Sequence, residues 1–449
     1  MNTPRIRIAV IDLGYGDGGK GTLIDYLARR HNAHTVVRFN GGSQAGHNVV
    51  TPDGRHHTFS SFGSGTFVGA HTHLASPVLV SPLGMQREAQ RLESVGVSNP
   101  LALMTVHRDC RIVTGFHLAA NQLRELALGD RRHGSCGVGI GETMHDDHEH
   151  PDDTIYARDL LDAATLTAKL YRVLERKRTE LATLIRELAT HPQAEVPFNL
   201  LTIPNMVDAL ADAYRSVAQR LTIVDEAFER DLFARKDAIL FEGAQGVLID
   251  EHVGFHPHTT WSTCTPKNVR DLFDRVAPEQ TSELRITGVT RAYMVRHGAG
   301  PLPTEDPELA SYLRDAHNVT GPWQGHVRYG WFDAPLLRYA MDACGPIDDI
   351  AVTCVDHLEQ LPVCRIVRDY DIGEIIPTFS EEALLERQRA LGERLGRLRP
   401  HAQETSAPGS TTARRIEDHV NAIESELGVP VRLVSHGPTA TDKVIRQGL

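Results

Sequence analysis

The sequence predicts an α/β protein with a large, mostly parallel central sheet and helices on both faces. Apolar strand-like runs alternate with segments of helical period along most of the 449 residues. The first strand-like run leads into a glycine-rich loop and then a helix, an order typical of parallel α/β folds. The length suits one large domain with insertions, and we expect a single domain over 1–449.

The expected elements follow in chain order. Each strand-like run is short and rich in apolar residues, as in strands that are covered on both faces. The charged block over about 157–230 has helical periodicity and predicts an inserted helical subdomain. Residues 402–412, rich in Ser, Thr, Pro and Gly, predict a surface loop. The strands are Ile6–Leu13, Thr35–Phe39, Ala238–Phe241, Leu284–Val289, Ile350–Val355 and Val431–Val434, and the helices are Thr22–Arg30, Leu83–Val95, Ala157–Leu188, Val207–Arg230 and Ala413–Leu427.

The glycine-rich loop is the strongest functional signal. The stretch IAVIDLGYGDGGKGT over 8–22 places glycines at 14, 16, 18, 19 and 21 around Asp17 and Lys20. Glycines let backbone N–H groups approach phosphate oxygens and a lysine adds positive charge, so the loop predicts a nucleotide site. It is a variant of the Walker A pattern, because Gly21 stands where Ser or Thr is usual and Thr22 follows. A carboxylate in such a loop repels phosphate unless a cation bridges them or the carboxylate takes part in the chemistry.

Composition argues against several classes of protein. The formal charge of −11, without any basic run, argues against a nucleic-acid surface. No apolar run approaches the ~20 residues that cross a bilayer and no signal peptide is evident, so we expect a cytoplasmic protein without a membrane partner. The six cysteines form no CxxC pair and are expected to be reduced thiols. Met144–His150, although rich in His and Asp, predicts a solvated loop rather than a metal site.

Three further motifs each follow a strand-like run. Because loops beyond the carboxyl ends of parallel strands form the ligand crevice of α/β folds, we expect these motifs to converge on one site. They read RFNGGSQAGH over 38–47, FEGAQG over 241–246 and RHGAGPLPTE over 296–305.

Together with GWFD at 330–333 and SHGPT at 435–439, these motifs resemble the adenylosuccinate synthetase family. The match runs in order from the first strand almost to the C-terminus, and its specificity comes from that order. The resemblance implies a C–N ligase of purine nucleotide synthesis. In that reaction GTP phosphorylates the 6-oxygen of inosinate, and the amino group of L-aspartate then displaces the phosphate. The resemblance also implies Mg²⁺ and a homodimer.

The resemblance gives catalytic roles to residues of the first two motifs. Asp17 matches the aspartate that takes the proton from purine N1 and also coordinates Mg²⁺. His47 matches the histidine that donates a hydrogen bond to the 6-oxygen and acts as general acid as phosphate leaves. Lys20 would meet the charge on the transferring phosphoryl group, and the carbonyl of Gly46 matches a further metal ligand.

Other matching positions imply substrate contacts. Thr320 falls in the loop that the family uses to hold the aspartate carboxylates, and Arg328 is the guanidinium that remains there. The nucleotide-binding positions are Gly16, Gly18, Gly19, Gly21, Thr22, Gln245, Thr260, Asp356, Gly437 and Pro438.

Several departures from the family pattern fall on residues that select substrates. Gly18 stands where the family has Glu, and SCGVGI over 135–140 replaces a second family signature. The arginine that reaches the nucleotide phosphate across the dimer interface has no clear counterpart. The family's arginine cluster in the aspartate loop is reduced to Arg328, which puts aspartate itself in question. Cys354 replaces the lysine of the guanine-reading pair while Asp356 remains, so ATP use stays open beside GTP.

The retained residues Asp17, Lys20 and His47 favour the family chemistry on a hypoxanthine-like nucleotide. One alternative is an N6-succinyl-2-amino-2′-deoxyadenylate synthase acting on dGMP, and another is a specialised nucleoside-biosynthesis ligase for a different purine-like nucleotide. A ligase or kinase that uses no aspartate is a third. A non-catalytic nucleotide-binding protein is the fourth, and it predicts loss of the three residues, all of which are present.

Overall fold

The computed structural model describes residues 5–129, 134–313, 323, 325–371 and 384–446, and its main feature is a ten-stranded sheet. The strand order is β19-β18-β15-β11-β1-β10-β2-β5-β7-β9, and every pairing is parallel except that of β18 with β19. The predicted fold class is therefore confirmed. The strands are β1 (Arg7–Asp12), β2 (Thr35–Arg38), β5 (His71–Leu74), β7 (Met104–His107), β9 (Thr222–Val224), β10 (Ile239–Glu242), β11 (Leu284–Arg291), β15 (Asp349–Thr353), β18 (Val431–Ser435) and β19 (Lys443–Ile445).

Both faces of this sheet are covered, and β1 shows how. Ile8 and Val10 pack on one side with Leu23 and Leu27 of α1 (Lys20–His31), while Ala9 and Ile11 belong to the core on the other side. That second core includes the helices α9 (Glu226–Ala234), α10 (Lys267–Val276) and α12 (Ala334–Cys344). Strands buried on both faces have no polar side to alternate with, which explains the continuous apolar runs of the sequence.

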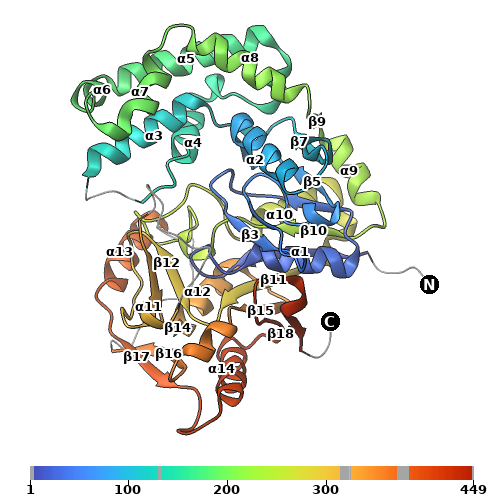
Figure 1. Ribbon diagram of the computed structural model, residues 1–449, viewed down its shortest axis with the longest axis vertical. Helices are drawn as coiled ribbons and strands as arrows, with labels where there is room; N and C mark the ends of the chain where they lie inside the picture. The colour runs from blue at the N-terminus through green and yellow to red at the C-terminus, as the bar shows by residue number, and fades with distance from the viewer. Residues whose placement is uncertain (1–4, 130–133, 314–322, 324, 372–383, 447–449) are drawn as a thin grey trace.

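A layer of helices lies over the β5–β7 side of the sheet, at one end of the molecule in Figure 1. Ala157–Leu188, predicted as one helix, is a 3₁₀ turn over Ala157–Leu161 followed by two helices. Val207–Arg230 is also divided, because β9 pairs with β7 between α8 and α9. The helices of the layer are α2 (Pro82–Ser94), α3 (Gly115–Leu128), α4 (Ile140–Glu149), α5 (Ala163–Glu180), α6 (Ala182–Glu187), α7 (Glu195–Thr202) and α8 (Met206–Ala218).

The small sheet of β14, β16 and β17 and the helix α14 form the opposite end of the molecule in Figure 1. The predicted loop over 402–412 begins inside a strand, since β17 runs to Glu404. The remaining strands are β3 (His47–Val50), β4 (His56–Phe59), β6 (Leu79–Val80), β8 (Arg111–Ile112), β12 (Met294–His297), β13 (Val327–Gly330), β14 (Phe332–Asp333), β16 (Arg365–Tyr370) and β17 (Pro400–Glu404), and the remaining helices are α11 (Leu309–Tyr312), α13 (Leu384–Leu395) and α14 (Thr412–Leu427).

The prediction of a solvated loop over Met144–His150 is wrong, because these residues fall almost entirely in α4. Asp146 is buried and accepts a hydrogen bond from the Nζ of Lys177 in α5 at 2.6 Å. Lys177 is itself fully enclosed and also contacts Glu142 and Glu180. A charge-rich segment thus becomes a helix because its carboxylates find buried cations on a neighbouring helix. The described residues hold no group of three or more His, Cys, Asp or Glu arranged for a metal ion.

Two expectations from composition concern the chain as a whole. The six cysteines all lie within the described residues, and their sulfur atoms are thiols rather than members of disulfides. Among the described helices, none is both long enough and apolar enough to cross a bilayer.

We predict that Asp333, at the start of α12, makes stability depend on pH. Burial raises the pKa of its carboxyl to about 7, although hydrogen bonds from Tyr370 and the backbone of Leu336 oppose the rise. The carboxyl of Asp333 therefore stays protonated in the folded state up to about pH 7, whereas in the unfolded chain it loses its proton near pH ~4. Because the folded state binds the extra proton, the free energy of unfolding of the wild type falls as pH rises from ~4 towards 7. Asp333→Asn should therefore gain stability relative to wild type, on the order of a few kcal/mol, between pH 4.5 and 8.

Urea unfolding followed by circular dichroism at several pH values measures this difference. Asp274→Asn, at an exposed position of α10, is the matched control and should follow the wild-type pH profile. A constant difference between Asp333→Asn and wild type across this pH range would contradict the assignment.

Candidate active site

A buried carboxylate organises the glycine-rich loop. Asp12, the last residue of β1, accepts hydrogen bonds from the backbone N–H groups of Gly14 at 2.8 Å and Gly18 at 2.6 Å. Its Oδ2 also lies 3.0 Å from the Nζ of Lys20, which donates a second bond to the carbonyl of Gly16 at 2.6 Å. Both charged side chains are 1% exposed. The loop is therefore held from inside, by a charge pair that is cut off from solvent.

Two glycines of the loop are required by close approaches. A Cβ on Gly18 would lie 2.5 Å from the carboxylate of Asp12, so no side chain fits there in this conformation. A glutamate there, as in the family pattern, would have to displace the Asp12 carboxylate from its present position. A Cβ on Gly21 would lie 2.8 Å from the Cβ of His47, so the loop and the strand that carries His47 pack directly together. Gly19 directly precedes α1.

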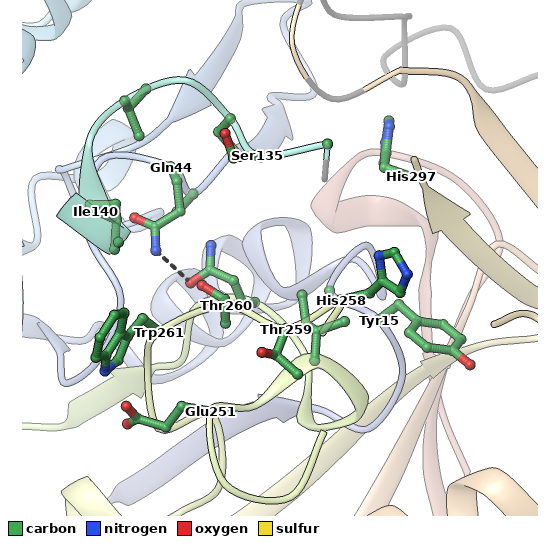
Figure 2. A pocket seen from close by; sticks show the side chains of 18 of the residues that line it. Tyr15, Gln44, Ser135, Ile140, Glu251, His258, Thr259, Thr260, Trp261 and His297 are labelled. Carbon is green, nitrogen blue, oxygen red and sulfur yellow. Dashed lines mark hydrogen bonds between the residues drawn. The ribbon is translucent and has the colours of Figure 1, made fainter. Parts of the chain in front are cut away.

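The motifs meet around a cavity of about 890 Å³. As expected, it joins the glycine-rich loop to the loops that follow β2, β10 and β12. Figure 2 shows Tyr15 and His297 towards one end of the cavity and Ile140 and Trp261 towards the other. Of the predicted site residues, those on its wall are Gly16, Asp17, Gly46, His47, Gln245 and Thr260.

His47 is fixed by Glu242, the last residue of β10. The Nδ1 of His47 lies 2.6 Å from Oε1 of Glu242, and both side chains are buried. The same carboxylate accepts bonds from the backbone N–H of Ser64 at 2.9 Å and from its hydroxyl at 2.5 Å. Because an ionised carboxylate can only accept, Nδ1 carries a proton and Nε2 is the nitrogen left to act on a ligand.

The electrostatics of this pair keep the carboxylate charged. Burial alone would raise the pKa of Glu242, but the charge and hydrogen bond of His47, the charge of Arg38 and the hydrogen bond of Ser64 together lower that pKa to about 2. Burial lowers the pKa of His47, and the charge of Glu242 opposes this effect. His47 is thus a nitrogen base on the cavity wall whose charged form is supported by a permanent neighbouring anion.

Asp17 is the carboxylate of the cavity and has a histidine partner. Nε2 of His297 lies 3.1 Å from its Oδ2, and Nε of Arg291 donates to its backbone carbonyl at 2.5 Å. Although burial raises the pKa of Asp17, the hydrogen bond and charge of His297, with Arg291 and Lys20, lower it to about 2. The side chain of Asp17 is ionised and 30% exposed, so it is available to a ligand.

Four of the predicted nucleotide-binding residues lie apart from the cavity, namely Thr22, Asp356, Gly437 and Pro438. The hydroxyl of Thr22 donates to the carbonyl of Pro438 at 2.7 Å, which joins α1 to the loop after β18. Lys443 donates to the carbonyls of Gly437 and Thr439, and burial lowers its pKa to about 8. Asp356 begins a 3₁₀ turn directly after Val355, which donates its N–H to Ser435. Within the described residues, these positions and Lys20 are not part of the cavity wall.

The predicted aspartate contacts are only partly placed. Thr320 lies outside the described residues. Arg328, on β13, donates to the carbonyls of Gly298 and Gly300 at 3.0 and 2.7 Å and pairs with Glu305 at 2.7 Å. Its guanidinium therefore braces the loop that follows His297.

Three residues that organise the site had no role in the sequence-based prediction. They are Asp12, Glu242 and His297. Asp12 and Glu242 each end a buried strand with a carboxylate, a pattern that marks a charge held at the carboxyl edge of a sheet. His297 ends β12, and no pattern in the sequence indicates that it reaches Asp17 from a different sheet.

Comparisons with known proteins agree with this architecture. The family model described as adenylosuccinate synthetase matches residues 9–444. An adenylosuccinate synthetase of Herminiimonas arsenicoxydans is 29% identical over 98% of both chains. Another, from Thermoplasma acidophilum, is 32% identical over 81% of this chain and 78% of its own.

Two solved structures share the fold. The fully ligated adenylosuccinate synthetase of Plasmodium falciparum superposes with a TM-score of 0.78 at 20% identity, covering 98% of this chain and 100% of that one. The succinoaminodeoxyadenylate synthetase of cyanophage S-2L, bound to dGMP and dATP, gives 0.61 at 16% identity, covering 99% and 96%.

The sheet is mostly parallel, and a glycine-rich loop and a cavity lined by Asp17 and His47 lie at the carboxyl ends of its strands. This arrangement is typical of a nucleotide-dependent enzyme. The family match covers nearly the whole chain. The chain belongs to the adenylosuccinate synthetase family, whose members are C–N ligases that join L-aspartate to inosinate with GTP and Mg²⁺.

We predict that Glu242→Gln lowers kcat by roughly 10²-fold or more, because His47 loses the anion that orients its ring and supports its protonated form. The KM values for both nucleotides should change little, since Glu242 is fully enclosed. Steady-state kinetics measure both parameters. Ser64→Ala is the matched control, because it removes one bond to the carboxylate and keeps the charge. Turnover of Glu242→Gln equal to wild type would contradict a role for this pair.

Proposed function

We propose that this protein joins L-aspartate to the 6-position of inosinate or a closely similar 6-oxopurine nucleotide, through a 6-phosphoryl intermediate and at the expense of GTP. The observation that carries the proposal is the placement of Asp17 and His47 on one cavity wall together with Gln245 and Thr260. In the family these positions match the two catalytic side chains and the contacts to the purine nucleotide.

The two catalytic side chains suit the two halves of the reaction. Asp17 is ionised and partly exposed, so it can accept the proton of purine N1 and make the 6-oxygen nucleophilic. His47 presents Nε2 and has Glu242 behind Nδ1, which supports donation of a hydrogen bond to the 6-oxygen and then of a proton as phosphate leaves. The proposed reaction needs a general base, Asp17, and a general acid, His47, in the same cavity.

The metal proposed for the site is Mg²⁺. The carboxylate of Asp17 and the carbonyl of Gly46 are both oxygen donors on the cavity wall, which fits a hard cation. When bound, the ion would neutralise phosphate charge next to the carboxylate.

GTP is proposed to bind along the loop from Gly16 to Thr22 and against Gly437 and Pro438. The tie between Thr22 and Pro438 brings these two segments together. Asp356 would accept from the N–H groups of guanine, and Lys20 would face the transferred phosphoryl charge.

The remaining proposals follow from family membership. We propose that Thr320 and Arg328 contact L-aspartate, and Arg328 would have to exchange at least one of its loop contacts to do so. A cytoplasmic homodimer acting in purine nucleotide synthesis is the corresponding expectation. Size-exclusion chromatography with light scattering tests the oligomeric state.

The proposal is tested by incubating the purified protein with Mg²⁺ and L-aspartate and crossing inosinate, guanylate and dGMP with GTP and ATP. Mass spectrometry should find a succinyl adduct of inosinate that depends on GTP. The likeness to the cyanophage enzyme makes dGMP with ATP the second candidate pair. Triphosphate consumption without an amino-acid adduct would overturn both.

We predict that Asp17→Asn abolishes adduct formation, because an amide cannot accept the N1 proton. Binding of inosinate, measured by isothermal titration calorimetry without Mg²⁺, should remain close to wild type. Turnover like that of the wild type in this variant would remove Asp17 from the mechanism.

We predict that His47→Ala lowers kcat by the ~10²–10⁴ that a positioned general acid supplies. Single-turnover mixing with GTP separates phosphoryl transfer from adduct formation. His56→Ala, on the neighbouring strand β4 and exposed, is the matched control and should retain activity. A loss below two-fold in His47→Ala would exclude the general-acid role.

A further inference from the structure

Trp261 is a large aromatic side chain on the cavity wall with 40% of its surface exposed. Burying the apolar surface of an indole is favourable in free energy, so an indole exposed to water can gain stability when a ligand covers it. At the edge of a substrate cavity, an exposed indole is available to be covered by a ligand.

The backbone on either side of Trp261 is firmly held. The N–H of Thr260 donates to the carbonyl of Ile249 at 2.7 Å, and the carbonyl of Ser262 accepts from the N–H of Glu251 at 3.2 Å. The hydroxyl of Ser262 also accepts from the N–H of Gly41 at 3.0 Å, next to the motif that delivers His47. The exposed indole therefore stands on an ordered turn, and ligand binding need not pay for ordering that turn.

Trp261 lies at the end of the cavity opposite to Tyr15 and to His297, the partner of Asp17. Figure 2 shows it beside Ile140, with Tyr15 and His297 on the far side of the cavity. The ring of His145 from α4 lies 6.4 Å from the indole, centroid to centroid, at an angle of 59°. This end of the cavity is thus lined by the indole of Trp261, the tilted imidazole of His145 and the mostly buried side chain of Ile140.

We infer that Trp261 is a substrate-contacting residue whose indole packs on the nucleoside part of the acceptor nucleotide. The inference rests on the proposed function, which puts the 6-position of the purine at Asp17 and His47. The rest of the nucleoside must then extend along the cavity, past Gln245 and Thr260, towards Trp261. A purine ring face and a ribose C–H face are both flat and weakly polar, so either can pack on an indole.

Intrinsic fluorescence tests this contact without any turnover. Inosinate, added without GTP or Mg²⁺, should quench the wild type, and Trp261→Phe should lose this quenching. Trp331→Phe is the matched control and should keep it, because Trp331 is outside the cavity wall and its Nε1 donates to Asp306 at 2.9 Å. Quenching by hypoxanthine alone would assign the contact to the base, and quenching by inosine but not hypoxanthine would assign it to the ribose.

Steady-state kinetics give the second readout. Trp261→Ala should raise the KM for inosinate about ten-fold or more, while the KM for GTP stays within about two-fold. Trp261→Phe should keep most of the affinity, since a phenyl ring can replace the indole face.

Quenching by inosinate that persists in Trp261→Phe, or unchanged KM in Trp261→Ala, would overturn the inference. Emission from Trp261 that changes with protein concentration but not with inosinate would also overturn it, because the indole would then be covered by another protein copy. The proposed function fails in a different way, namely by the absence of any succinyl adduct.

Discussion

Two buried carboxylates, at the ends of neighbouring parallel strands, hold the candidate active site of this protein in place. Asp12 ends β1 and fixes the glycine-rich loop and Lys20, while Glu242 ends β10 and fixes His47. The two strands are hydrogen-bonded in register, with Val10 opposite Glu242. A carboxylate is tolerated at such depth only because each of its oxygens has donors, and in both cases a basic side chain is among them. His47 and the glycine-rich loop are therefore positioned against the same pair of strands.

Much of the fold could be predicted from local patterns. The six predicted strands all belong to the central sheet, because strands covered on both faces leave long apolar runs. Strands β5 and β7 were not predicted, since His71, His73 and His107 break their apolar pattern. The three-residue strands β9, which falls inside the predicted helix Val207–Arg230, and β19 were not predicted either. His73 is nevertheless buried against Glu229 of α9, a contact between residues far apart in sequence. The charged segment of α4 was misread for the same reason, because its buried partner Lys177 lies on another helix.

In the candidate site too, residues within contiguous motifs could be predicted, whereas their partners from distant strands could not. Asp17, His47 and Gly46 were predicted from contiguous motifs, and the cavity brings them together. The partners that set their protonation, Glu242 and His297, come from distant strands, and only the three-dimensional structure pairs them. Two departures from the family pattern also gain a physical setting. Gly18 leaves room for the Asp12 carboxylate. Cys354, which stands where the family has lysine, and Asp356 are both electrostatic neighbours of Lys443.

The bond between Thr22 and Pro438 joins the first helix to a loop more than four hundred positions later in the chain. Its partner loop is carried by β18, which takes its place in the sheet beside β15. During synthesis, the glycine-rich loop is thus made first and the segment that Thr22 contacts is made almost last. In the proposed function, the site for GTP is complete only after most of the chain has left the ribosome, so a nascent or interrupted polypeptide has Asp17 and His47 without a complete site for the proposed energy donor.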